Sequence, residues 1–91
     1  MKNKNIYIGL KFNPGYDNAP KILFKFYSFE TDKLLTMFRK EKIPIIKDKV
    51  LVSILEQLPV GSEIPEELYF TIANIYKILY NNGYIKKEEN N

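Results

Sequence analysis

A turn followed by a helix, in the last third of the chain, most constrains the fold. The segment from Gly61 to Pro65 ends in a proline that suits the first position of a helix, where its missing N–H costs nothing. An apolar stripe at helical spacing follows, made of Leu68, Ile72, Ile75, Tyr76 and Leu79. Gly83 can end this helix in the left-handed conformation. We therefore expect a helix over about residues 65–80, with Ile64 filling the core at a fixed corner.

Two segments near the N-terminus alternate between apolar and other residues, as strands with one buried face do. The side chains expected on the buried face are Ile6, Ile8, Leu10 and Phe12 from the first segment and Ile22, Phe24 and Phe26 from the second. Residues 13–20 between them consist mainly of turn-forming residues and begin with Asn13–Pro14. The pattern predicts an antiparallel hairpin with a loop of about eight residues.

Two more helices and one more strand are expected between the hairpin and the last helix. The first helix covers about residues 29–41 and can be capped by Ser28 or Thr31. The apolar run 43–46 predicts a third strand, joined to the hairpin by a right-handed crossover and therefore parallel to its neighbour. Asp48 can cap a short helix that follows. The fold class is α/β: a small mixed sheet of about three strands packed by three helices.

Length and composition limit the chemistry of the chain. Its 91 residues predict one domain over 1–91, with a core of about 5–82 and a polar tail over 83–91. The sequence contains neither histidine nor cysteine, which removes the commonest general base and the thiolate metal ligands. No apolar run approaches the roughly 20 residues that a membrane-spanning helix needs. We expect no enzyme activity, no catalytic residues, no metal and no cofactor.

Four short motifs follow the order of these elements. They are Ile6–Tyr7–Ile8–Gly9–Leu10, Ala19–Pro20–Lys21–Ile22, Ile43–Pro44–Ile45–Ile46 and Gly61–Ser62–Glu63–Ile64–Pro65–Glu66–Glu67–Leu68–Tyr69. Together they resemble the C-terminal cytoplasmic domain of FlhB and its virulence relatives, the substrate-specificity switch of flagellar and type III secretion export. The resemblance covers about residues 5–80, and the last motif is the specific one.

The departures from the family pattern bear on function. The family carries Asn-Pro-Thr-His before its first strand and cleaves itself there after the Asn, whereas residues 1–5 here read Met-Lys-Asn-Lys-Asn. Asn13–Pro14 lies after the strand and is expected to be a hairpin turn. The Lys-Gly pair of the family is Lys25–Phe26 here, and the Arg of its Pro-Leu-Ala-Arg motif is Ser53. We therefore expect no self-cleavage, and the chain resembles a stand-alone, FlhX-like copy of the fragment that cleavage releases.

The resemblance implies a non-catalytic component of the export apparatus that binds the export gate or export substrates. The expected partners are a membrane-embedded, FlhB-like gate protein and other export components or substrates, with no nucleic acid and no direct insertion into the membrane. The expected form is a cytoplasmic monomer that can dock at the gate. Because the family strand before the cleavage point is missing, the first strand is expected to have an open edge for strand addition, at Ile6, Ile8 and Leu10.

A second expected binding surface is basic, since residues 1–50 contain 11 Lys/Arg and 5 Asp/Glu, whereas residues 51–91 contain 3 and 6. Its members are Lys33, Arg39, Lys40, Lys42, Lys47 and Lys49. Two alternatives remain open at this point. One is a small basic nucleic-acid-binding module that stacks bases on aromatic residues such as Phe24 and Tyr27. The other is a subunit of an unrelated complex, including an enzyme or nuclease that works with other chains.

Overall fold

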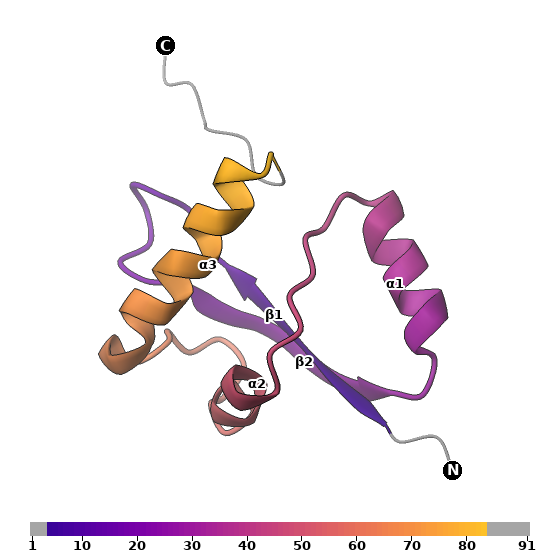
Figure 1. The fold of residues 1–91 in the computed structure, drawn as a ribbon. Helices are drawn as coiled ribbons and strands as arrows, with labels where there is room; N and C mark the ends of the chain where they lie inside the picture. The colour runs from indigo at the N-terminus through magenta and orange to yellow at the C-terminus, as the bar shows by residue number, and fades with distance from the viewer. Residues whose placement is uncertain (1–3, 84–91) are drawn as a thin grey trace.

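A computed structural model describes residues 4–83 and contains a two-stranded sheet with three α-helices (Figure 1). The elements in chain order are β1 (Asn5–Lys11), β2 (Lys21–Ser28), α1 (Thr31–Lys40), α2 (Lys49–Leu55), a single 3₁₀ turn η1 (Glu66–Leu68) and α3 (Tyr69–Asn81). The α/β class with three helices is confirmed. Most of the expected polar tail, residues 84–91, lies outside the described residues, as do residues 1–3.

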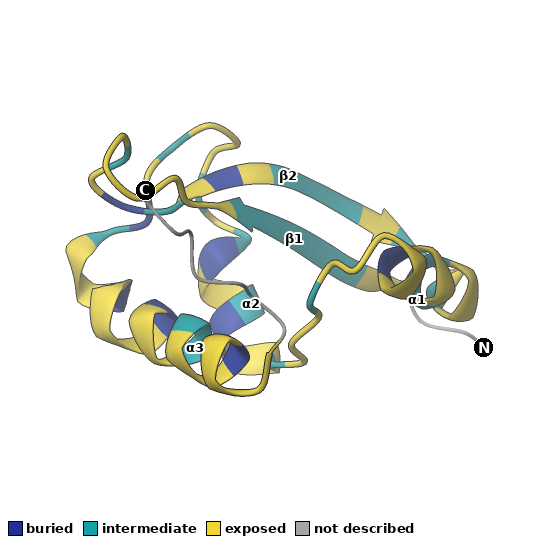
Figure 2. Ribbon diagram, turned by 90° about the horizontal axis from the view of Figure 1, so that it is seen from above, coloured by how far each residue is buried: buried dark blue, intermediate teal, exposed yellow. Residues whose placement is uncertain are grey.

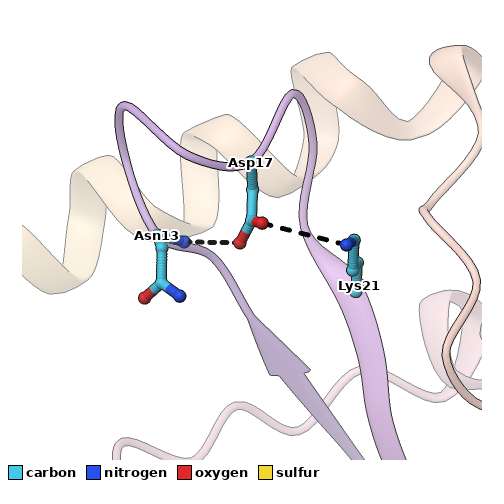
Figure 3. A network of polar contacts seen from close by, with 3 residues as sticks. All are labelled: Asn13, Asp17 and Lys21. Carbon is cyan, nitrogen blue, oxygen red and sulfur yellow. Dashed lines mark hydrogen bonds and ion pairs between the residues drawn. The ribbon is translucent and has the colours of Figure 1, made fainter.

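The two strands pair antiparallel, as the alternating pattern predicted. Hydrogen bonds close the first half of the loop between them, and an ion pair joins the loop to the start of β2 (Figure 3). The carbonyl of Asn13 accepts from the backbone N–H groups of Tyr16 at 3.1 Å and Asp17 at 2.9 Å, and the Asp17 carboxylate accepts from the N–H of Asn13 at 2.9 Å. The same carboxylate lies 3.9 Å from the amine of Lys21. Asn13–Pro14 is therefore part of a turn, as expected.

A β-bulge changes which residues of β2 share a face. Gly9 pairs with Phe24, but the next residue, Leu10, pairs with Ile22, so Leu23 has no partner in β1. Since side chains alternate along a strand, this extra residue moves Ile22 to one face of the sheet and Phe24 to the other. The prediction that Ile22, Phe24 and Phe26 share one buried face is therefore wrong.

The main core lies on the face of the sheet that carries Ile22. Its buried members are Ala19, Ile22, Leu51, Leu55, Ile64, Leu68 and Ile72, and Ile8 and Leu10 of β1 pack against them. Ile64 is only 2% exposed, which confirms its predicted place in the core. Backbone hydrogen bonds hold this corner against β2: the N–H of Ile22 donates to Ser62 O at 2.9 Å, and the N–H of Ile64 donates to Pro20 O at 2.9 Å.

Aromatic side chains cover the opposite face of the sheet. The ring of Tyr7 stacks on Phe26 with centroids 5.2 Å apart, and Phe24 lies 5.5 Å from Phe26. Phe38 of α1 completes this cluster, with its ring 6.2 Å from that of Tyr7. Phe38 is the one buried residue of α1. The sheet therefore lies between α1 on one face and the core of α2 and α3 on the other (Figure 1).

The predicted third strand does not form. Residues 43–48 are neither helix nor strand, and in the described part of the chain the sheet has two strands rather than about three. The expected crossover and parallel pair are therefore wrong as well. The reason is that α1 and α2 lie on opposite faces, so the connection between them has to pass around the sheet and cannot run along it. The connection passes in front of the strands in Figure 1, and Figure 2 shows it on the side of β1 that faces away from β2.

Helix ends agree with the sequence only in part. The Asp48 carboxylate caps α2 by accepting from the N–H of Leu51 at 3.0 Å, as predicted. The residue at the N-cap of α1 is Glu30, so neither of the two hydroxyl residues proposed as caps holds that position. Pro65 precedes the 3₁₀ turn, and α3 begins only at Tyr69. Gly83 has a φ of 78°, consistent with the expected left-handed helix end.

A substitution at Gly9 tests the packing of the aromatic face. A Cβ atom at this position would lie 2.2 Å from Cε2 of Phe24, so the ring would have to move. We expect Gly9→Ala to lower the free energy of unfolding by about 1–3 kcal/mol, measured by urea denaturation. In a Phe24→Leu background the same change should cost clearly less. Equal costs in the two backgrounds would show that the ring does not set the requirement for glycine.

Candidate partner-binding site

The first candidate site is the edge of β1. In residues 4–83, β1 pairs with β2 along one edge, and no strand pairs with its other edge. The outer edge of β2 is partly occupied, because Lys21 at its start forms an isolated β-bridge with Glu63. In an antiparallel pair, alternate residues direct their N–H and C=O groups away from the partner strand. β1 therefore presents a seven-residue edge that is suited to backbone pairing.

The three residues expected at this edge do not have equivalent surroundings. Ile8 and Leu10 pack against the main core, so their side chains are already used within the chain. Ile6 is half-buried and pairs with Tyr27. What β1 offers to a partner is therefore chiefly its backbone edge.

The second candidate site is the basic set, which the structure divides into separate groups. All six residues are exposed. Arg39, Lys40 and Lys42 gather at the C-terminal end of α1, where the helix dipole favours cations. Lys47 lies just before α2 and Lys49 is its first residue, whereas Lys33 lies in the first turn of α1. The expected single basic surface is thus centred on the C-terminal end of α1.

These cations are not neutralised by neighbours within the described residues. The one ion pair that the structure contains between residues 4 and 83 is Lys21–Asp17, in the hairpin loop. Acidic residues do lie close in sequence, since Asp32 is in the first turn of α1 and Glu41 follows the helix. A negatively charged partner would therefore meet a mixed surface with an excess of positive charge.

Sequence reasoning missed a polar contact between β2 and α2. The amine of Lys25 donates to the carbonyl oxygens of Glu56 at 2.9 Å and Leu58 at 3.1 Å, just beyond the end of α2. Tyr27 donates a hydrogen bond from its hydroxyl to the Glu56 carboxylate, and this bond raises the pKa of Tyr27. Lys25 is the residue at which the sequence resembles the Lys-Gly pair of the family motif. In this chain its charge stabilises a helix end, which is a structural use.

Three other kinds of site can be compared with the structure of residues 4–83: a metal site, a membrane-spanning helix and a platform for stacking bases. No group of three or more potential metal ligands comes together between residues 4 and 83. Within the same range, no helix has the length and apolar character needed to cross a membrane. The rings of Phe24 and Phe26 lie against each other, and Phe26 is also stacked on Tyr7, so they are not free platforms for bases. The surface features that remain are a strand edge and a basic helix end.

Comparisons with known proteins agree with this architecture. A family model described as "FlhB HrpN YscU SpaS Family" matches residues 3–79. The uncharacterized protein YlqH of Bacillus subtilis (strain 168) is 30% identical over 73 residues, which are 80% of this chain and 78% of that protein.

Solved structures share the fold at lower identity. A mutated (H265A) EscU C-terminal domain superposes with a TM-score of 0.72 at 21% identity, covering 84% of this chain and 93% of that one. The PscU C-terminal domain superposes with a TM-score of 0.70 at 21% identity, covering 82% and 96%. The expected α/β domain is thus confirmed, with a sheet of different strand number. The chain belongs to the FlhB HrpN YscU SpaS family of protein-export components and has the fold of that family's C-terminal domain.

Proposed function

We propose that this protein is a non-catalytic component of the flagellar or type III protein export apparatus, and that it acts by binding the export gate or export substrates. Family membership supports the place in export. The free edge of β1 supports the mode of action, because an edge of unpaired backbone groups can accept a strand from another chain. In this proposal the chain acts as one domain and as a monomer in the cytoplasm, docked at the membrane gate.

The identity of the supplied strand follows from the resemblance to self-cleaving relatives. In those relatives the strand before the cleavage point belongs to the same sheet. This chain has no Asn-Pro-Thr-His sequence and no histidine, so we propose that it does not cleave itself. A gate protein that has been cut after its Asn retains the preceding strand. The chain would then take the place of the gate's own C-terminal fragment on that strand.

A pull-down with an FlhB-family gate protein tests this proposal. The bait is the gate truncated after its cleavage Asn, and the control bait is the same gate with its own C-terminal fragment in place. We expect the truncated gate to bind with a Kd on the order of micromolar, corresponding to about 8 kcal/mol, and the intact gate to bind far more weakly. Absence of binding to the truncated gate at tens of micromolar would contradict the proposal.

The basic end of α1 gives a second measurable expectation. We expect Lys40→Glu and Lys42→Glu each to weaken binding severalfold, mainly by slowing association, and to reduce its dependence on salt. Lys77→Glu on α3 is the matched control, because it makes the same charge change at another exposed position. Titrations at two ionic strengths provide the measurement. If the α1 variants and the α3 variant behave alike, the cluster acts only through net charge.

A further inference from the structure

The connection between α1 and α2 passes around the free edge of β1. Phe38 places α1 against Tyr7 on one face of the sheet, whereas Leu51 and Leu55 place α2 in the core on the other face. The connection therefore has to cross from one face to the other. Figure 1 shows it passing in front of the strands, and Figure 2 shows it on the side of β1 that faces away from β2. We call residues 42–47 of this connection the strap.

The strap is apolar and makes almost no backbone hydrogen bonds. The N–H of Ile43 donates to Phe38 O at 2.8 Å. Beyond Ile43, no residue of the strap makes a backbone hydrogen bond to the part of the chain that the structure describes. Ile45 is 37% exposed and Ile46 is 45% exposed. Isoleucines are among the residues that folded proteins bury most often, so three of them in an irregular surface segment mark a place where cover is missing.

A strand added to β1 would occupy the place that the strap crosses. Such a strand lies in the plane of the sheet, about 4.8 Å from β1. We infer that the strap encloses the added strand from outside, so that the half-exposed isoleucines of the strap become buried against it. This inference rests on the proposed function and specifies its partner further: a single extended segment whose outward side carries apolar residues.

The strap also argues against a second copy of this chain as the occupant. If two copies paired through their β1 edges, the two sheets would meet edge to edge. Each molecule has its strap across that edge, so the two straps would lie in the way. A single strand added to β1 would have the strap, and no further strand, on its outer side. Both ends of the strap are anchored, by α1 and α2, so the segment has to enter end-on or the strap has to lift. A gate chain with a free end after its cleavage Asn meets this requirement.

Binding kinetics with the truncated gate protein test the inference. We expect the double substitution Ile45→Ser/Ile46→Ser to raise the dissociation rate about tenfold, because apolar burial is lost, while association changes about twofold at most. Val60→Ser/Ile78→Ser is the matched control, since both residues are 56% exposed and lie outside the strap. Thermal melting of each variant shows that the fold is retained.

Substitutions in β1 separate this inference from the proposed function. Ile6→Pro and Tyr7→Pro remove neighbouring N–H groups, one directed to β2 and the other to the free edge. Because Tyr7 packs on Phe26 and Phe38, Ile6→Ala and Tyr7→Ala control for the lost side chains, and the proline variant whose Tm equals that of its alanine control reports on the edge alone. If that variant loses binding while the strap variant binds like the wild type, the strap inference is wrong and strand addition stands. If the strap variant dissociates about tenfold faster and the control does not, the inference holds. If the wild-type protein does not bind, both are wrong.

Discussion

Replacing Ile64 with alanine is expected to lower the free energy of unfolding by about 2–5 kcal/mol, a large part of the 5–15 kcal/mol that a typical domain has. The side chain is 2% exposed and lies among core residues from α2, η1 and α3. Its backbone N–H also donates to Pro20 O at 2.9 Å, so the corner cannot move freely to fill a cavity. Ile64 joins the hairpin to the last helix, and the loss should therefore affect the whole fold.

Urea denaturation monitored by circular dichroism provides this measurement. Ile54→Ala is the matched control, because it removes the same atoms from a side chain of α2 that is 44% exposed. We expect the control to cost clearly less than Ile64→Ala, since most of its surface remains in contact with water. A cost at Ile64 no larger than that at Ile54 would show that the corner is not part of the core.

Replacing Phe38 with alanine is expected to release α1 from the sheet while the rest of the fold persists. Phe38 is the one buried residue of this helix, and its ring contacts Tyr7. Phenylalanine-to-alanine changes in cores cost about 3–5 kcal/mol, but here the loss falls on one helix that has little other attachment. The free energy for opening α1 should therefore decrease by up to that amount, and the core of α2 and α3 should change little.

Amide hydrogen exchange distinguishes local from global loss. In Phe38→Ala, we expect amides of α1 to exchange much faster and amides of α3 to keep their protection. Met37→Ala is the control, because this neighbouring residue of α1 is 49% exposed. Retained protection of α1 in Phe38→Ala would mean that contacts other than the aromatic cluster hold this helix. Equal loss of protection in α1 and α3 would mean that the fold is a single cooperative unit.

Local signals in the sequence predicted several elements correctly, because the interactions that determine them are themselves local. The hairpin follows from two alternating segments around the turn residues at Asn13–Pro14. The cap of α2 follows from a carboxylate three residues before the N–H that it accepts from. The buried corner at Ile64 follows from a large apolar residue between a turn and a helix.

The bulge and the missing third strand depended on interactions that periodicity does not record. One unpaired residue, Leu23, reverses the face of every later residue of β2, and strict alternation in the sequence gives no sign of it. The run 43–46 has the composition of a strand, but a strand needs a neighbour as well as a propensity. Residues 43–46 have no strand beside them, because Phe38 packs α1 on the face of the sheet opposite α2 and the connection passes around the sheet.

The candidate site was predictable in its chemistry more than in its geometry. The open edge of β1 was expected from the resemblance to the family, and the basic residues were visible from composition alone. The packing of Ile8 and Leu10 against the core could not be predicted, because it depends on where α2 and α3 lie. The strap was missed because its isoleucines were assigned to the sheet. Its position became evident only once both helices had been placed.

Amide exchange along β1, with and without the truncated gate protein, tests the central claim most directly. The account predicts that the edge-directed N–H groups of β1 exchange quickly in the free protein and become protected when the gate segment is added, while those bonded to β2 are protected in both states. Protection gained only at the C-terminal end of α1, or at no site in β1, would contradict strand addition as the way in which this protein binds.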